Sequence, residues 1–498
     1  MKKVMKRLSK RPAVLGASFV FLVSLSLYLD TLAPTVLTYD SATLQTRAYV
    51  LGIGYPTGYP TYIMLGKLFT YLPFGDVAYR VNLSSAVYGA LAAAAIYLTA
   101  LRAAPGEKGF FTHAAAGLGA LAFATGPTFW GQAIKAEVYT LAVLLVTLTI
   151  YTLLAWRDTG RDGYLLAATF LVGLSMTAHM TSGLLIPAGL LFVFLVDRSK
   201  LKRVGLVTKG FALFVLGLSP YLYLPIRASM DPPANYADPS NLQGLWFILS
   251  GGNFKGQMFA FGPDRLAERL GVYLDDLLLQ FPLILLAVAV LGAVILLFRD
   301  RPLAAVLGAL MVGYLVFALE YGISDIIPYF VPTYLILALL LAVGLGWIAE
   351  KLWGAARTFS LSRVFLPAAT LLAVSVLLVF GTLGTRTEVD QSDNYEARRL
   401  LESVARDTAS GATVLGHRET ATLRYMQLVE GRRRDLGVET VTTGDVARIA
   451  DVAVSKGPTY FVKPGATAVG NIREAGYDIY PVERGLLYEV RPRDVDRT

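Results

Sequence analysis

Long apolar runs separated by short basic loops constrain this chain more than any other feature of its sequence. Runs of about 20 apolar residues, the length that crosses a bilayer, occur near 13–33, 82–101, 114–133, 138–156, 204–225, 281–298, 303–320, 329–349 and 363–383. The chain is 55% hydrophobic and only 16% charged, whereas soluble domains carry about 25% charged residues. The sequence therefore predicts an α-helical polytopic membrane protein.

One further apolar stretch, 164–196, is too long for one span and short for two. Five polar or helix-breaking residues interrupt it: Ser175, His179, Thr181, Ser182 and Pro187. Lys and Arg collect in cytoplasmic loops, and basic loops at 157–161 and 198–209 flank the stretch. Both basic loops lie on the cytoplasmic side only if the stretch 164–196 crosses the membrane twice. We therefore predict about eleven spans, with the N-terminus inside and the C-terminus outside.

The basic start of the chain and the run 13–33 also have the pattern of a signal peptide. The apolar run is longer than a typical signal sequence, so we expect a retained first span. The net charge of +9 is explained by basic cytoplasmic loops, and we expect no nucleic-acid partner. Cysteine is absent, which excludes disulfides, thiolate metal sites and a cysteine nucleophile.

Four ionisable residues fall at the membrane edge of the predicted outer face: Asp40, Glu137, His179 and Arg227. Such residues are costly there unless they are paired or functional. Acids and a histidine beside an arginine indicate acid/base chemistry next to an anion site. Each also has a structural alternative. The two acids could sit at helix N-termini, His179 could satisfy backbone groups, and Arg227 could extend to the interface.

The composition changes near Thr387, where charges become dense and apolar runs shorten. We divide the chain into a membrane domain, 1–386, and a small extracytoplasmic α/β domain, 387–498. In the second, strands are predicted at Ala412–Leu415, Leu436–Thr442 and Pro458–Val462, with helices at Thr420–Glu430 and Asp445–Ser455. A separate amphipathic segment, 264–281, predicts a helix that lies in the membrane interface.

Four sequence blocks carry a family resemblance. Asp40-Ser41 precedes LGIGYPTGYPTYIMLGKLFTYLPFGDVAYRVN at 51–82, and AEVYTL, GLSMTAHMT and YLYLPIRA follow at 136–141, 173–181 and 221–228. In this order, over roughly 35–260, they resemble a family of polytopic membrane proteins that is similar to protein O-mannosyltransferases and belongs to the GT-C class. The chain departs from the family at Ala42-Thr43, which replace Gly-Glu, and at Tyr55-Pro56-Thr57-Gly58, which replace His-Pro-Pro-Gly.

The resemblance implies an inverting GT-C glycosyltransferase in the cell membrane with its active site on the extracytoplasmic face. It would move a sugar, such as mannose, from a polyprenyl-phosphate carrier to a protein Ser/Thr or glycan acceptor. Asp40 would be the catalytic base. Glu137, His179, Arg227 and Tyr59 would bind substrate, with Arg227 beside the lipid phosphate. No metal ligand and no certain cofactor is predicted, and dependence on a divalent metal is left open.

The main alternative is a multi-span transporter or lipid flippase, and a structural scaffold is a third reading. The sequence lacks the inverted repeat and the paired broken helices that are typical of many transporters. A scaffold explains neither the ionisable residues nor the ordered blocks. If the chain is an enzyme, we expect loops 34–81 and 226–280 to face each other across one cavity.

Overall fold

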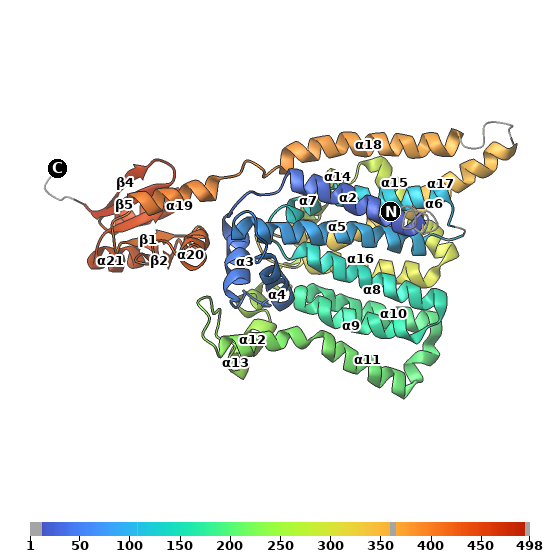
Figure 1. The fold of residues 1–498 in the computed structure, drawn as a ribbon, viewed down its shortest axis with the longest axis horizontal. Helices are drawn as coiled ribbons and strands as arrows, with labels where there is room; N and C mark the ends of the chain where they lie inside the picture. Colours follow the sequence, from blue (N-terminus) through green and yellow to red (C-terminus); the bar gives the residue numbers. More distant parts are fainter. Residues whose placement is uncertain (1–11, 107, 359–364, 494–498) are drawn as a thin grey trace.

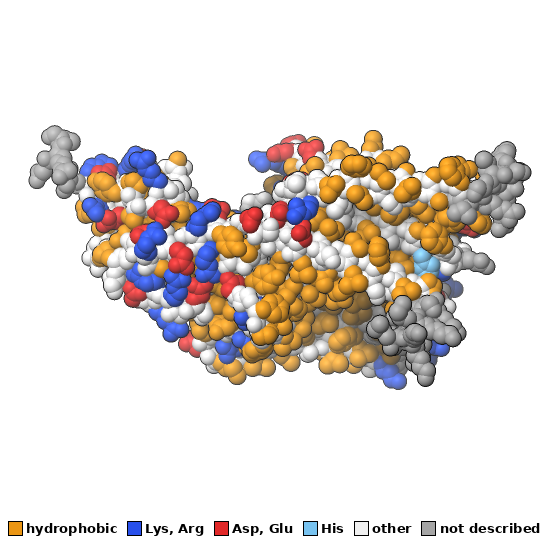
Figure 2. Space-filling view, turned by 45° about the horizontal axis from the view of Figure 1, so that its top comes forward, with side chains coloured by type: hydrophobic (Ala, Val, Ile, Leu, Met, Phe, Trp, Pro, Cys, Tyr) orange, Lys and Arg blue, Asp and Glu red, His pale blue; other side chains and the backbone are white. Residues whose placement is uncertain are grey.

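The computed structural model describes residues 12–106, 108–358 and 365–493. These residues form a helical bundle with a small α/β unit at one end (Figure 1). Figure 2 shows charged side chains gathered over that unit, while the bundle presents mostly hydrophobic side chains. The predicted class, a helical membrane protein with a small C-terminal sheet, is confirmed. The basic N-terminal residues 2–11 and Arg363 lie outside the described residues.

Eleven helices occupy the predicted spans. They are α2 (Pro12–Asp30), α5 (Val77–Ala103), α6 (Phe110–Ala124), α8 (Tyr139–Thr159), α9 (Asp162–Ala178), α10 (Leu185–Asp197), α11 (Val204–Gly217), α15 (Leu283–Arg299), α16 (Arg301–Leu319), α17 (Val331–Thr358) and α18 (Phe365–Val389). Within the described residues, seven helical segments are long and apolar enough to cross a membrane, or up to nine if each of two bent pairs is one span. Helices α6 and α9 are apolar but shorter. Length and composition thus support up to nine of the predicted spans, and the total of eleven stays a prediction.

The stretch 164–196 is divided at the residue that the sequence singled out. Helix α9 ends at Ala178, and His179 follows with an extended backbone, φ −158°. A 3-10 turn, η1 (Met180–Leu184), then leads into α10. The break divides the stretch into two helical segments, whereas a single straight helix over 164–196 would be too long for one membrane span.

Shorter elements connect the long helices. They are α3 (Tyr39–Val50), α4 (Pro60–Phe69), α7 (Pro127–Ala133), α12 (Tyr223–Ala228), α13 (Leu242–Leu249) and α14 (Pro263–Gln280), with 3-10 turns η2 (Arg198–Lys202), η3 (Ser219–Leu222), η4 (Gly252–Gln257) and η5 (Ile327–Phe330). Helix α14 is the predicted amphipathic helix, and it is bent by 100° from α15. A helix in this orientation suits a position along the membrane surface.

Close backbone contact holds α15 against α17. A Cβ added to Gly292 would lie 1.9 Å from the Leu340 carbonyl oxygen, and one on Gly344 would lie 2.2 Å from that of Val288. Small residues allow this approach between helices that cannot gain from burial against water. The same pattern occurs between α6 and α17, where a Cβ on Gly119 would meet the Ala338 carbonyl at 2.7 Å.

Residues 396–492, here called the sheet region, form a five-stranded sheet in the order β2-β1-β3-β5-β4. The strands are β1 (Thr413–Gly416), β2 (Gly437–Thr440), β3 (Thr459–Val462), β4 (Tyr477–Glu483) and β5 (Leu487–Pro492). The first three are parallel, and β5 pairs antiparallel with β3 and β4. The sheet region has two hydrophobic clusters. Helices α19 (Glu396–Asp407) and α20 (Thr420–Leu428) contribute side chains to the first cluster, and α21 (Val446–Lys456) and α22 (Ala466–Glu474) contribute to the second.

The three predicted strands and two predicted helices of the sheet region are present, within two residues at most ends. The sequence pattern did not indicate α19, α22, β4 or β5. Helix α18 runs to Val389, so the proposed boundary at 386/387 falls in its last turn. The division into two domains stays a prediction.

Candidate active site

The loops 34–81 and 226–280 are in direct contact. The sequence led us to expect them on two sides of one cavity, and that cavity stays a prediction. The backbone amide of Ile53 donates to the Ala234 carbonyl at 2.7 Å. Just before the second loop, the hydroxyl of Tyr223, in α12, donates to the Gly52 carbonyl at 3.0 Å. The rings of Tyr55 and Tyr236 pack edge to face with centroids 5.0 Å apart. The loops are therefore in direct contact at this end of the bundle.

Asp40 lies in the first turn of α3, but it does not cap the helix. The N-cap residue is Thr38, and it makes no side-chain capping hydrogen bond. Among the described residues, none donates a hydrogen bond to the Asp40 carboxylate. The carboxylate is exposed, and the positive end of the helix dipole favours its ionised form. It is therefore free to accept a proton from a bound molecule.

Charged groups from four separate segments surround Asp40. Crowding by protein atoms on one side raises the pKa of its carboxyl, and the negative charge of Asp325, in the loop before η5, raises it further. Arg418 of the sheet region, Arg47 of α3 and Lys135 act in the opposite direction. An acid with a raised pKa accepts a proton more readily than an ordinary carboxylate, which suits a general base.

Glu137 lies next to this group and is almost completely buried, with 9% of its surface exposed. Burial raises the pKa of its carboxyl to about 8, and the negative charges of Asp40 and Asp325 add to the rise. The ammonium of Lys135, 3.9 Å away, opposes it. Glu137 is therefore mostly protonated at neutral pH, and it can donate a hydrogen bond.

Hydrogen bonds from α5 fix the backbone around both acids. The fully buried Asn82 accepts from the Gln45 side chain at 2.8 Å and from the Ala136 amide at 2.9 Å, and it donates to the Ala33 carbonyl at 3.0 Å. Ser85 accepts from the Glu137 amide at 3.1 Å. We did not single out Asn82 from the sequence. A polar side chain inside an apolar run was the available signal.

Tyr59 and His179 complete one side of the site. Their rings stack with centroids 6.0 Å apart, and Tyr139 and Tyr329 lie 5.3 and 5.4 Å from the imidazole. Burial raises the pKa of the Tyr59 hydroxyl, with smaller contributions from Asp40, Tyr321 and Glu137 in that order. The structure thus brings Tyr59 near both acids and against His179.

His179 borders a small cavity of about 20 Å³. Its Nδ1 lies 2.7 Å from the Thr181 hydroxyl, while its buried Nε2 has no hydrogen-bond partner in the described residues. The buried hydroxyl of Tyr314, another residue that lines this cavity, lacks a partner there as well. A space of this size holds about one water molecule, so sugar binding must use other space.

The structure does not bring Arg227 to Asp40. The guanidinium donates to the carbonyls of Leu51 at 2.8 Å and Val50 at 3.1 Å, at the C-terminal end of α3. Asp40 lies at the other end of that helix, about 15 Å away at 1.5 Å per residue. The structure uses the Arg227 guanidinium to cap the far end of this helix, so it does not favour Arg227 as the partner of a phosphate beside Asp40. The role of Arg227 beside the lipid phosphate stays a prediction.

Arg47 is a better placed cation that sequence reasoning missed. It lies on α3 with Asp40, and its guanidinium stacks over the Tyr55 ring at 4.3 Å. Burial lowers the pKa of Arg47, and the charge of Asp40 counteracts this. No acid in the described residues forms an ion pair with it. Inside an amphipathic helix, Arg47 looked like an ordinary surface residue.

No group of three or more His, Asp or Glu side chains within the described ranges could hold a metal ion. Asp40, Glu137 and Asp325 influence one another electrostatically, but their arrangement does not provide the set of oxygen ligands that a divalent cation prefers.

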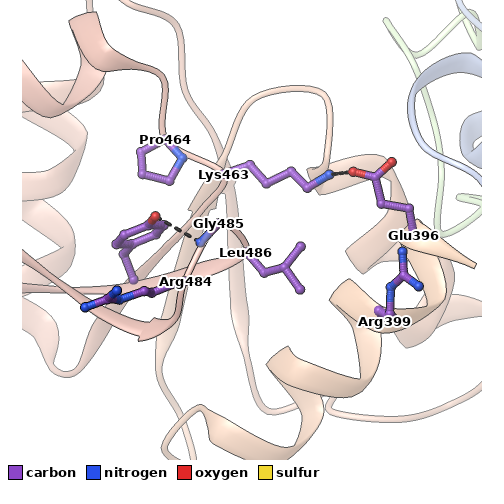
Figure 3. A pocket seen from close by; sticks show the side chains of 8 residues that line it. Glu396, Arg399, Lys463, Pro464, Arg484, Gly485 and Leu486 are labelled. Atoms are coloured by element: carbon purple, nitrogen blue, oxygen red, sulfur yellow. Dashed lines mark hydrogen bonds and ion pairs between the residues drawn. The ribbon is translucent and has the colours of Figure 1, made fainter.

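A second, wider cavity of about 570 Å³ lies within the sheet region (Figure 3), and Asp40 is not among its lining residues. Arg399, Lys463 and Arg484 line it, and Lys463 is bonded to Glu396, the one acid of its lining. The Tyr488 hydroxyl accepts from the Gly485 amide at 3.0 Å. The lining of this cavity has excess positive charge and no free carboxylate, so Asp40 stays the predicted catalytic residue.

Comparison with known proteins shows what the chain is similar to. Residues 40–202 match the family described as Protein O-mannosyl-transferase TMEM260 N-terminal domain. The mouse Protein O-mannosyl-transferase TMEM260 is 27% identical over 451 residues, which cover 86% of this chain and 62% of the mouse protein. The chain thus spans about three-fifths of the length of that relative. Asp40, Tyr59, Glu137 and His179 all fall inside the matched family domain.

Two solved structures share the fold. Cupriavidus metallidurans ArnT bound to undecaprenyl phosphate matches with a TM-score of 0.62 and 13% identity, over 96% of this chain and 97% of ArnT. Archaeoglobus fulgidus AglB, an oligosaccharyltransferase in complex with an inhibitory peptide and a dolichol-phosphate, matches with a TM-score of 0.59 and 12% identity, over 98% and 75%. The predicted resemblance is confirmed: this chain is similar to the TMEM260 protein O-mannosyl-transferases, its residues 40–202 match the model of their N-terminal domain, and its fold is similar to that of ArnT and AglB.

Proposed function

We propose that the chain is an inverting membrane glycosyltransferase that moves a hexose, such as mannose, from a polyprenyl-phosphate carrier to a hydroxyl of a protein or glycan. The observation that carries this proposal is the free carboxylate of Asp40, in the matched family domain, beside the guanidinium groups of Arg47 and Arg418. ArnT has the same fold and was solved with undecaprenyl phosphate, and AglB with dolichol-phosphate and a peptide. None of the proteins named above is a transporter, so the flippase alternative gains no support.

The reaction is a single displacement. The acceptor oxygen forms a bond to C1 of the sugar as the bond between C1 and the phosphate oxygen breaks. The electron pair of the broken bond leaves with the lipid phosphate, and the acceptor proton passes to Asp40. A base in this position typically contributes about 10²–10⁴-fold in rate. Cations near the leaving oxygen stabilise the charge that develops there.

The other site residues bind and orient in this scheme. Protonated Glu137 donates a hydrogen bond to a sugar hydroxyl or to a phosphate oxygen. An ionised carboxylate would repel the phosphate. Tyr59, held by its stack on His179, offers an aromatic face and a hydroxyl for the sugar. The charge of Arg47 acts on Asp40, whereas the Arg227 guanidinium is taken up by backbone carbonyls, so Arg47 is the better phosphate partner within the bundle.

The location of the site on the extracytoplasmic face stays a proposal that rests on the basic-loop pattern. Dependence on a divalent metal also stays a prediction, and adding EDTA to the transfer assay tests it. The sugar and acceptor are proposed by similarity to the relatives, of which the chain spans only part.

The test is sugar transfer from a polyprenyl-phosphate mannose donor, with full-length protein in lipid nanodiscs. We expect Asp40→Asn to reduce transfer by about 10²–10⁴-fold while binding of undecaprenyl phosphate is retained. Asp264→Asn is the matched control, because Asp264 is also an exposed acid in a first helical turn, that of α14. Wild-type transfer by the Asp40 variant would remove the catalytic assignment.

A further inference from the structure

The sheet region is docked against the segment that carries Asp40. Helix α20 packs on α3 (Figure 1), and the Thr422 hydroxyl of α20 donates to the Leu37 carbonyl at 3.2 Å. The Tyr425 hydroxyl accepts from the Ala78 amide, at the start of α5, at 3.1 Å. Both α20 side chains are buried. The contact therefore positions the sheet region firmly beside the candidate active site.

An ionic contact reinforces this docking. Arg398 of α19 donates to the Thr35 hydroxyl at 2.8 Å and to the Asp76 carboxylate at 3.0 Å. Asp76 is the N-cap of α5 and accepts from the Tyr79 amide at 2.7 Å. Side chains from α19 and α20 thus hold both ends of the first outer loop, which fixes the position of anything that the sheet region presents to Asp40.

Arg418 is the residue of the sheet region that lies most directly against the segment carrying Asp40. It follows β1 in the turn before α20, and its guanidinium lies over the ring of Tyr39, 5.4 Å from the centroid. The same group donates to the Ser324 hydroxyl at 3.4 Å. Tyr39 precedes Asp40 and Ser324 precedes Asp325, so Arg418 bridges the two segments that carry these acids.

Arg418 also occupies the edge of the sheet where ligands usually bind. Strand β1 is parallel to its neighbours β2 and β3, and chain order changes direction at β1 because β2 and β3 lie on opposite sides of it. In open α/β sheets, ligands bind outside the carboxyl ends of the strands at such a switch point. The loop after β1 is therefore suited to contact a ligand.

Arg424 adds a second cation from the same surface. It is an exposed residue of α20, and its charge is close enough to lower the pKa of Arg47 across the contact. Within the described residues, neither Arg418, Arg424 nor Arg47 forms an ion pair. The charges of Arg47 and Arg424 repel each other, and Arg418 adds a further positive charge beside Asp40. An anion bound among these groups relieves the repulsion. Guanidinium groups match phosphate oxygens in pairs of hydrogen bonds.

We propose that the sheet region completes the active site, with Arg418 and Arg424 binding the phosphate of the donor lipid opposite Arg47. This inference rests on the proposed glycosyl transfer and names the groups that receive its leaving group. When the bond between C1 and the phosphate oxygen breaks, the lipid phosphate gains negative charge. Arg418 and Arg424 then stabilise it from the side opposite the bundle, while Asp40 takes the acceptor proton.

The test measures binding of undecaprenyl phosphate to full-length protein in nanodiscs, together with sugar transfer. We expect Arg418→Gln to weaken binding by about 10- to 100-fold, as the loss of a charge-assisted contact does. Arg418→Lys keeps the charge but not the paired hydrogen bonds, so it should weaken binding less. Arg424→Gln should act in the same direction, and among the described residues its side chain makes no hydrogen bond that the substitution would remove. The control is Arg448→Gln, an exposed arginine on α21, away from α3 (Figure 1).

The outcomes separate this inference from the proposed function. Absence of transfer by the wild-type protein would overturn the proposed function itself. If the wild-type protein transfers sugar and binds undecaprenyl phosphate, but the folded Arg418 and Arg424 variants bind as tightly as Arg448→Gln, the inference alone is wrong. Equal loss of binding in Arg448→Gln would show that only general charge attraction is involved, and would also overturn it.

Discussion

Arg227 and Asp40 lie at opposite ends of one helix, α3. Asp40 is in its first turn, and the Arg227 guanidinium donates to the last carbonyls, those of Leu51 and Val50. A cation at a helix C-terminus satisfies carbonyls that have no partner within the helix and interacts favourably with the dipole. Arg227 thus supports the helix that presents Asp40, without contacting the reacting groups.

Replacing Arg227 by Ala should therefore act mainly on stability. The two carbonyls lose charged hydrogen-bond donors, each worth about 1.5–3 kcal/mol, so the thermal midpoint should fall. Binding of undecaprenyl phosphate should remain close to the wild-type value. Thermal unfolding and lipid binding, measured on the same nanodisc preparation, check this. Arg265→Ala, at an exposed site on α14, is the control. Loss of lipid binding with unchanged stability would restore the original phosphate-partner prediction.

The orientation of the chain gives a second prediction. Basic loops stay in the cytoplasm, so Ser199, in the basic turn η2, should be inside, and Ser455, on α21, outside. Both serines are exposed, and the chain has no other cysteine. In intact cells, an impermeant thiol reagent should label Ser455→Cys and not Ser199→Cys. After permeabilisation both should react. Equal labelling of intact cells would rule out an odd number of spans between them.

The spans were predictable because crossing a bilayer requires apolar runs of a set length, and even the break at His179 showed in the polar residues around it. The candidate site was predictable only in part. Asp40, Tyr59, Glu137 and His179 gather because α3, α4 and α8 all end or begin at the same side of the bundle. Their proximity was predictable because the membrane topology places all four on the same side of the membrane.

The arginines were not predictable in the same way. Arg418 stands 378 positions after Asp40 in the sequence, and the two meet only because α20 docks on α3. In a charged, water-facing region an arginine looks like a solvated surface residue. Arg227 was predicted to bind phosphate for a related reason. Its hydrogen-bond acceptors, the Leu51 and Val50 carbonyls, lie far away in the sequence, and no local pattern shows that the guanidinium binds them.

Asp325 gives a prediction on the pH dependence of transfer. Its negative charge is one cause of the raised pKa of Asp40. Asp40 must be ionised to act as a base, so the rate should fall as the pH drops through that raised pKa. Asp325→Asn removes the repulsion and should move this acid limb to lower pH. The pH profile of transfer at saturating donor measures the shift. Asp264→Asn should leave the limb in place. A limb that does not move in Asp325→Asn would show that another group controls the profile.

Glu137 predicts how stability depends on pH. The pKa of its carboxyl is about 8 in the folded protein, against an ordinary value of 4.5, mainly because it is buried. Between these values the folded state keeps the proton and the unfolded state loses it, so the stabilisation present below about pH 4.5 is lost as the pH rises to about 8. Glu137→Gln cannot lose a proton, so its free energy of unfolding should exceed that of the wild-type protein increasingly from pH 5 to pH 8, by a difference on the order of a few kcal/mol. Thermal midpoints measured across this pH range check the trend. Glu268→Gln, at an exposed site on α14, should show no such trend. Parallel pH curves for the wild-type protein and Glu137→Gln would mean that Glu137 is ionised in the fold, and its role as a hydrogen-bond donor would be lost.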